Sequence, residues 1–171
     1  MAHDLSGLPA GVTLRPVTPD DREFLLHAYT TTRKEELAPV PWTDGERTAF
    51  LEMQFDAQAA AYQGAYPDGE FLVVLLDGDP AGRLYLGRLP GELRLIDVTL
   101  LPEHRSNGIG TALIGAIVAR ADRDGVEVGL HVEPWNPARR LYERLGFERV
   151  ELRGIYEYMR RPALVELNTA S

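Results

Sequence analysis

The residues best suited to chemistry lie in a short glycine-containing turn, Arg105-Ser106-Asn107-Gly108-Ile109-Gly110. An apolar stretch at 93–101 leads into the turn and predicts a strand, and apolar residues at helical spacing over 108–122 follow it. Glycines at the start of a helix let a ligand approach backbone N–H groups that have no partner within the helix. Because that end of a helix also carries a partial positive charge, the turn predicts a site for an anion such as phosphate.

Two common phosphate-binding motifs do not fit this turn. A P-loop requires Gly-Lys-Ser/Thr, whereas Gly110 is followed by Thr111 and Ala112, and the only lysine of the chain is Lys34. A dinucleotide-binding fingerprint requires a third glycine at the position that Leu113 occupies. The pattern that remains is Arg-x-x-Gly-x-Gly after a strand that ends in Leu-Leu-Pro.

The composition is that of an ordinary globular protein, and it excludes several kinds of site. With 171 residues and a formal net charge of −8, we expect one domain spanning 1–171 and no nucleic-acid partner. The absence of cysteine excludes disulfides, thiolate metal sites and a cysteine nucleophile. No serine lies in a Gly-x-Ser-x-Gly motif, and the four histidines are not spaced as metal ligands. No stretch is long enough to span a bilayer, so we expect a cytoplasmic protein that uses neither a membrane nor a metal.

The elements expected around the turn follow the order β-α-α-β-β-β-α-β-α-β-β. Thr18 and Thr43 cap two helices that follow a first short strand. A three-strand meander precedes the turn, and the helix after the turn leads to an alternating strand, which makes a right-handed parallel crossover. A helix opened by Pro137 precedes two final strands. The expected ranges are 12–17, 18–37, 43–66, 70–77, 81–88, 92–101, 108–122, 126–132, 136–146, 147–152 and 155–160, between a loose start at 1–11 and a C-terminal tail at 162–171.

The order of elements and the motifs of the second half resemble the GNAT N-acetyltransferase superfamily. The motifs are the strand ending in Leu-Leu-Pro, the Arg-x-x-Gly-x-Gly turn, and Leu-x-Val-x-x-x-Asn-x-Ala-x-x-x-Tyr-x-x-x-Gly-Phe from Leu130 to Phe147. One departure is that Asn136 stands one residue closer to Ala138 than the family has it. The resemblance implies an α/β fold with a mixed central sheet of about six to seven strands, splayed at the cofactor site, and about four helices.

The resemblance also implies an activity and a cofactor. It implies an enzyme that transfers an acetyl group from acetyl-CoA (coenzyme A as co-substrate) to an amine, by direct attack in a ternary complex. The acceptor would be a small-molecule or peptide amine, and the acidic balance of the chain favours a cationic one. Edge strands near 155–160 could pair in a homodimer. Two alternatives on the same fold stay open, a non-catalytic acyl-CoA sensor and an interaction domain.

The resemblance places the cofactor on the turn and on the strand before it. Backbone N–H groups of the turn would cradle the pyrophosphate, and Arg105 would add charge or fix the loop. Open backbone groups of Val98 and Leu100 would pair with the pantetheine amides, and the Leu100 N–H could polarise the thioester carbonyl. Asn136 could contact the cofactor besides capping its helix. Arg139 and Arg140 are either surface charges or include one ligand of the cofactor's 3′-phosphate. The expected cofactor-binding residues are Val98, Leu100, Arg105, Ser106, Asn107, Gly108, Ile109, Gly110, Thr111, Asn136 and Arg139.

The expected catalytic residues are an acid and a base. Tyr142 lies at the tyrosine of the family pattern, where it would protonate the leaving thiolate, although it could also be a core tyrosine. Three residues compete for the base: Glu92, Asp97 and His131. Asp97 interrupts an otherwise apolar strand, where a partly desolvated carboxylate would be a stronger proton acceptor. Several residues could be core or could line an acceptor pocket, namely Trp42, Met53, Phe55, Tyr62, Tyr66, Tyr85, Tyr156, Glu157 and Tyr158.

Overall fold

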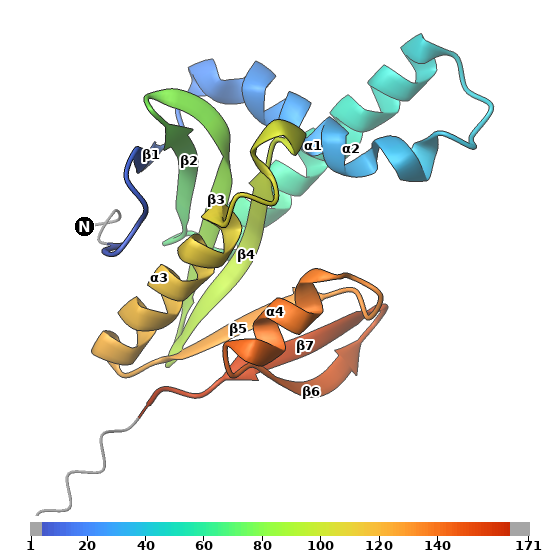
Figure 1. The fold of residues 1–171 in the computed structure, drawn as a ribbon. Helices are drawn as coiled ribbons and strands as arrows, with labels where there is room; N and C mark the ends of the chain where they lie inside the picture. The colour runs from blue at the N-terminus through green and yellow to red at the C-terminus, as the bar shows by residue number, and fades with distance from the viewer. Residues whose placement is uncertain (1–4, 165–171) are drawn as a thin grey trace, which may run out of the picture.

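The computed structural model describes residues 5–164 as a seven-stranded mixed sheet with helices on both faces (Figure 1). The strands are β1 (Val12–Pro16), β2 (Glu70–Leu76), β3 (Asp79–Leu89), β4 (Glu92–Leu100), β5 (Glu127–Val132), β6 (Glu148–Arg153) and β7 (Tyr156–Arg161). The helices are α1 (Arg22–Leu37), α2 (Asp44–Ala65), α3 (Ile109–Asp124) and α4 (Ala138–Arg144). The spatial order of the strands is β1-β2-β3-β4-β5-β7-β6, which confirms the expected fold class.

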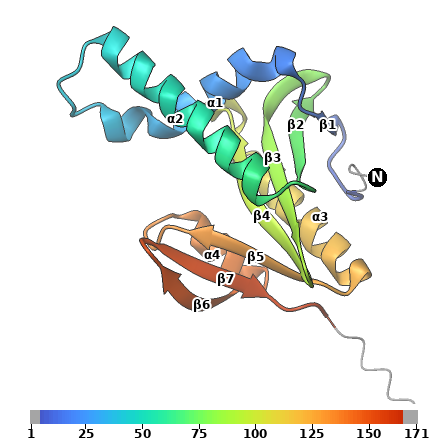
Figure 2. The ribbon, with the colours of Figure 1, turned by 180° about the vertical axis from the view of Figure 1, so that it is seen from behind.

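Helix α3 covers one face of the sheet, whereas α2 crosses the opposite face (Figures 1 and 2). Apolar residues at helical spacing bury one side of α3, and Leu113 and Ile117 are completely buried there. They belong to the main core together with Leu84 and Leu86 of β3. Gly125, in the left-handed conformation with φ of 68°, ends the helix as expected. This packing fixes the N-terminal end of α3 next to the end of β4.

A second, smaller core lies between α1 and α2 and holds these helices together. It contains Leu25 and Tyr29 of α1 and Leu51 and Phe55 of α2, all of them buried. The start of α2 is the predicted capping box, in which the Thr43 hydroxyl accepts from the backbone of Glu46. Phe55 is therefore a core residue, whereas the side chain of Met53 on the same helix is exposed.

The segment before β1 packs more closely than the expected loose start. Leu5 is buried in the main core, and Leu8 is partly buried against it. Both side chains are apolar, and burial of apolar surface gives the segment a reason to pack although it has no regular structure. Residues 1–4 of the expected start and 165–171 of the expected tail lie outside the described residues.

Strands β4 and β5 form the parallel pair of the described sheet, and they pair along only part of their length. Pairing runs from Glu92 opposite Glu127 to Leu95 opposite Leu130, and then stops. At that point the pairing of β3 with β4 shifts, because Tyr85 faces Asp97 and the next residue of β3 faces Leu95. Ile96 is thus the extra residue of a bulge, and a bulge bends its strand. The sheet is splayed between β4 and β5, as the resemblance implied.

A buried ion pair ties α3 to the sheet at the end away from the turn. Glu70 of β2 accepts two hydrogen bonds from Arg120 of α3, at 2.7 and 2.9 Å, and one from Arg88 of β3, at 2.6 Å. Burial acts to raise the pKa of Glu70, but the hydrogen bonds from Arg120 and Arg88 outweigh it and hold the pKa below its ordinary value. The carboxylate is therefore ionised and fully partnered at neutral pH.

Removal of this carboxylate charge is predicted to destabilise the fold. Glu70→Gln should lower the free energy of unfolding by about 3 kcal/mol, because the guanidinium of the buried Arg120 loses its main counter-charge. Urea denaturation measures the loss. The matched control is Glu127→Gln, whose exposed carboxylate lies 3.7 Å from Arg160 and should matter by less than about 1 kcal/mol. Equal losses in the two variants would contradict this role of Glu70.

Candidate functional site

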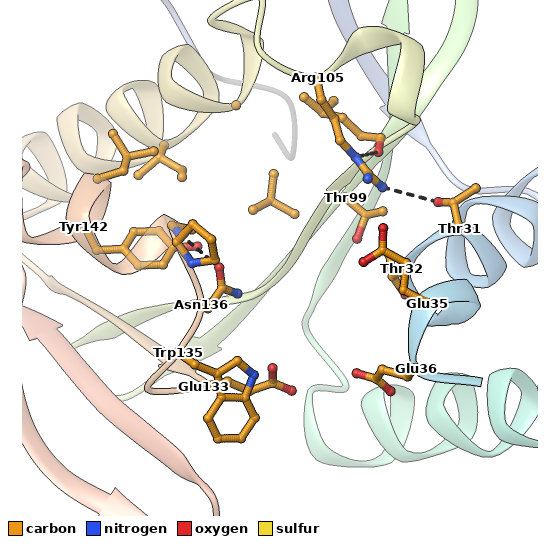
Figure 3. Close-up of a pocket in the computed structure, with 17 residues that line it drawn as sticks. Thr31, Thr32, Glu35, Glu36, Thr99, Arg105, Glu133, Trp135, Asn136 and Tyr142 are labelled. Atoms are coloured by element: carbon orange, nitrogen blue, oxygen red, sulfur yellow. Dashed lines mark hydrogen bonds between the residues drawn. The ribbon is translucent and has the colours of Figure 1, made fainter. Parts of the chain in front are cut away.

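A cleft of about 740 Å³ opens where β4 and β5 part. Figure 3 shows Tyr142 and Asn136 on one side of it and Thr31 and Thr32 of α1 on the other. A narrower gap of about 140 Å³ continues from the cleft between the two strands. The predicted site residues that line the cleft are Val98, Leu100, Arg105, Gly110, Asn136 and Tyr142. Residues far apart in the sequence thus meet in one cavity.

The glycine-containing turn forms the upper end of the cleft. Gly108 has a φ of 80° and Ser106 a φ of 64°, so the backbone there adopts the left-handed conformation twice before α3 begins. The first intrahelical bond of α3 runs from Ala112 to the Gly108 carbonyl, at 3.0 Å. The N–H groups of Gly110 and Thr111 therefore precede the helical hydrogen-bond ladder and are available to a ligand. Ile109 differs, because its side chain is buried in the core.

Arg105 holds the turn in place. Its Nε donates to the Leu100 carbonyl at 2.9 Å, and its Nη2 donates to the Thr31 hydroxyl at 3.4 Å (Figure 3). These bonds join the turn to the end of β4 and to α1. They support the alternative in which Arg105 fixes the loop, while its guanidinium still lines the cleft.

Tyr142 of α4 faces the cleft and the gap although most of its surface is buried. The side-chain oxygen of Asn136 caps the start of α4 by accepting from the Ala138 N–H at 2.9 Å. Burial, and then the negative charge of Asp97, raises the pKa of Tyr142 to about 12. No hydrogen bond among residues 5–164 uses its hydroxyl group. A protonated phenol thus points into the cavity with its proton free to be donated.

The two predicted carboxylates on β4 are both engaged by arginines. Asp97 pairs with Arg83 of β3 and accepts from the Thr99 hydroxyl at 2.8 Å, and it lines the gap. Glu92 lies at the other end of β4, where Arg94 donates to it at 2.5 Å and Tyr158 donates to its second oxygen. Glu92 lines neither the cleft nor the gap. The structure therefore brings Asp97, but not Glu92, close to Tyr142.

His131 of β5, the third candidate for the base, lies where the gap opens on the face that α2 covers. It lines the gap and also a hollow of about 290 Å³ on that face. Partial burial, and then the charges of Arg94 and Arg153, lower the pKa of His131 below its ordinary value of 6.5. Its ring is consequently neutral at pH 7 and can accept a proton.

Arg139 lies beside the cleft, not in it. Its Nε is 2.9 Å from a carboxylate oxygen of Glu157 on β7, a buried side chain. Arg139 also lines a neighbouring surface hollow of about 540 Å³ with Trp135 and Arg140. One of its functions is therefore to attach α4 to β7, and an additional contact with a cofactor stays a prediction.

Sequence reasoning missed the cleft wall opposite Tyr142 and two residues beside Asn136. Side chains of α1 face the cavity, and so does the loop after β5 (Figure 3). The α1 positions follow no motif, because they reach the cleft only through the packing of α1 against the sheet, and Glu133 and Trp135 occupy unspecified positions of the motif from Leu130 to Phe147. The residues concerned are Thr31, Thr32, Glu35, Glu36, Glu133 and Trp135.

Nowhere within residues 5–164 do three or more histidine, aspartate or glutamate side chains gather in a way that could hold a metal ion. Within the same range, every helix is too short or too polar to cross a membrane.

Comparison with known proteins gives the family of this chain. The sequence profile of the acetyltransferase (GNAT) family matches residues 28–147, which include most of α1 and every residue that lines the cleft and the gap. The chain therefore belongs to the acetyltransferase (GNAT) family, whose enzymes use acetyl-CoA.

Individual proteins are similar to this chain over part of its sequence or in fold. The chain is 35% identical over 66 residues to the ribosomal protein bS18-alanine N-acetyltransferase of Haemophilus influenzae, a match that covers 38% of this chain and 45% of that protein. The chain thus spans less than half the length of this curated relative. In fold it is similar to the PaiA N-acetyltransferase of Thermoplasma acidophilum in complex with coenzyme A, with a TM-score of 0.67, 18% identity, and 88% and 98% of the two chains covered. The ribosomal-protein-S18-alanine N-acetyltransferase of Escherichia coli is also similar, with a TM-score of 0.63, 20% identity, and 92% and 97% covered.

The residues of the cleft fit coenzyme A. Beyond Leu95, the edge of β4 that faces β5 has no paired strand, and its backbone groups can form hydrogen bonds with the amides of a ligand. The position where Gly110 would carry a side chain is open, and its nearest neighbour is Leu100 at 3.8 Å. The N–H groups of the helix start are suited to phosphate oxygens.

Filling that open position is predicted to prevent coenzyme A binding without unfolding the protein. Gly110→Leu should weaken binding at least about 100-fold in calorimetry, because the new side chain occupies the cleft, while Tm stays the same or rises through better helix propensity. The matched control is Gly115→Leu on the same helix, where the side-chain position is also open and lies outside the cleft. Unchanged affinity in the Gly110 variant would contradict this location of the cofactor.

Proposed function

We propose that the protein transfers an acetyl group from acetyl-CoA to a primary amine in a ternary complex. The observation that carries the proposal is the cleft itself, in which the helix start, the open edge of β4 and the Tyr142 hydroxyl line one cavity. The name of the Haemophilus relative gives it an alanine acceptor. For this chain the acceptor is proposed only as an amine that reaches the cleft through the gap between β4 and β5.

The protein's part in the reaction is to hold two substrates and to move protons. Acetyl-CoA supplies an activated acetyl thioester. Backbone N–H groups around Gly110 hold the pyrophosphate, and the backbone of Val98 and Leu100 orients the pantetheine arm toward the gap. Tyr142 gives its proton to the sulfur that leaves as the new C–N bond forms. The absence of cysteine in the chain supports direct attack by the amine over the commonest covalent route.

The amine must lose a proton, and we assign its removal to His131. Both carboxylates considered for this role are bound to arginines, and Glu92 lines neither the cleft nor the gap, although its charge acts on His131. His131 is neutral and borders the gap, and its contact with Arg153, 3.4 Å from Nε2, is long and exposed. Asp97 is the alternative, because it also borders the gap.

Loss of the Tyr142 hydroxyl is predicted to remove chemistry and leave binding intact. In a thiol-release assay with acetyl-CoA and a panel of amines, Tyr142→Phe should lower kcat about 100-fold or more, because the leaving thiolate loses its acid. Calorimetry should give the same Kd for coenzyme A as the wild type. The control is Tyr29→Phe, a buried tyrosine of the second core. Coenzyme A binding without turnover in the wild type would favour a sensor instead of an enzyme.

The pH dependence is predicted to separate the acid from the base. Since the pKa of Tyr142 is raised to about 12, the phenol keeps its proton and kcat should not fall between about pH 8 and about pH 10. Since the pKa of His131 lies below 6.5, its loss of a proton should produce a rising limb below that pH. Profiles of kcat at saturating amine for His131→Gln and Asp97→Asn decide between the two bases. The variant in which the rising limb disappears has lost the base, and a limb kept in His131→Gln would refute our assignment.

A further inference from the structure

The hollow on the α2 face has a composition that bears on the acceptor. It measures about 290 Å³ and lies on the side of the sheet that α2 crosses in Figure 2. At about 30 Å³ for each water-sized group, this volume accommodates roughly ten non-hydrogen atoms. Its lining residues are Tyr62 and Tyr66 of α2, Arg94, Leu95 and Ile96 of β4, His131 of β5 and Tyr156 of β7.

The hollow communicates with the cleft through the gap. The gap shares Leu95, Ile96 and His131 with the hollow. It shares Val98, Asn136 and Tyr142 with the cleft. A molecule in the hollow can therefore reach the end of a pantetheine arm that lies in the cleft, with His131 beside its path.

The polar groups of the hollow are mainly hydrogen-bond donors, and no carboxylate lines it. Arg94 donates through Nε to Glu92 at 2.5 Å and through Nη1 to Tyr66 at 3.1 Å. Arg94 also interacts with Tyr158, whose ring centroid lies 5.4 Å from the guanidinium carbon. Within residues 5–164, the side-chain donors of the hollow with no assigned hydrogen bond include Nη2 of Arg94 and the hydroxyl groups of Tyr62 and Tyr156. Burial raises the pKa of Tyr62 to about 12, so this phenol stays a donor. Such a set of hydrogen-bond donors complements a carboxylate.

The positions of Arg94 and His131 set the distance between the two ends of a ligand. Arg94 is paired with Gly129, and His131 follows two residues further along β5. Side chains alternate along a strand, so the two lie on one face of the sheet about 7 Å apart along the strand direction. The charge of Arg94 helps to lower the pKa of His131, which also indicates that they are close. A carboxylate on Arg94 would thus place a neighbouring amine next to His131.

We propose that the acceptor is a small α-amino acid with an apolar or aromatic side chain, whose carboxylate binds Nη2 of Arg94 and whose amine faces His131. The tyrosine rings and Ile96 surround the side chain. This inference rests on the proposed function, and it departs from the cationic acceptor that the acidic composition favours. The carboxylates of Glu35, Glu36 and Glu133 line the cleft and not this hollow.

The test compares substrates that differ only in the carboxylate. Thiol release is measured with leucine, leucinamide and 3-methylbutylamine, with the corresponding phenylalanine set, with spermidine and with a leucine-initiated dipeptide. The proteins are the wild type, Arg94→Lys, and Arg88→Lys as a control on an exposed guanidinium outside the hollow. The lysine keeps a charge for Glu92 but has no equivalent of Nη2.

The wild type should prefer the free amino acid over its decarboxylated amine by about 10-fold or more in kcat/KM, since a hydrogen bond to a charged group contributes about 1.5–3 kcal/mol. Arg94→Lys should remove most of this preference, mainly through KM for the amino acid, and Arg88→Lys should keep it. Because each ratio is taken within one protein, partial unfolding of a variant cancels.

The outcomes separate this inference from the proposed function. If spermidine, the decarboxylated amine or the dipeptide is turned over faster than the free amino acid, the amino-acid acceptor is overturned. The protein is then still an acetyltransferase. An unchanged preference in Arg94→Lys overturns the role of Arg94. Coenzyme A binding in calorimetry without turnover of any amine overturns the amino-acid acceptor, and loss of coenzyme A binding itself in the wild type overturns the proposed function.

Discussion

The separation of β4 from β5 is the constraint on which the site depends. The two strands are joined only from Glu92 to Leu95, and the bulge at Ile96 turns β4 away where the pairing ends. Each strand then has an unpaired edge inside the sheet instead of at its border. Unpaired backbone groups carry a free-energy penalty when they are shielded from water, so an extended ligand with its own amides suits this slot. The helix start, the bulge and Tyr142 are useful because they all face the same opening.

The site also depends on the neutralisation of charged side chains within the sheet. Arg83 is almost completely buried, and it is tolerated because Asp97 lies beside it on the neighbouring strand. Glu92 and Arg94 neutralise one another two residues apart on β4. These pairs neutralise the charges of β3 and β4 next to the gap, although the whole chain carries −8. Net charge therefore says little about the groups that a bound amine would meet.

The elements and the helix-start motif could be predicted from the sequence because their signals are local. The capping box at Thr43, the glycine that ends α3 and the apolar periodicity of α3 each depend on a few neighbouring residues. The partnerships of Glu92 and Asp97 could not be predicted, because they depend on register between strands and on which side chain lies across. The burial of Leu5 could not be predicted for the same reason, since the surface that buries it belongs to distant residues.

The short pairing of β4 with β5 also has a mechanical meaning. The sheet consists of two parts, β1 to β4 and β5 to β7. Backbone pairing joins them only at the end of β4 where Glu92 lies, and α3 connects them in the chain. Two parts joined along so short a stretch can rotate about it, and the unpaired ends of β4 and β5 then move the most. A molecule bound between these ends joins the two parts of the sheet at a second place. Binding therefore also restricts the relative motion of the two parts of the sheet, besides making contacts in the cleft.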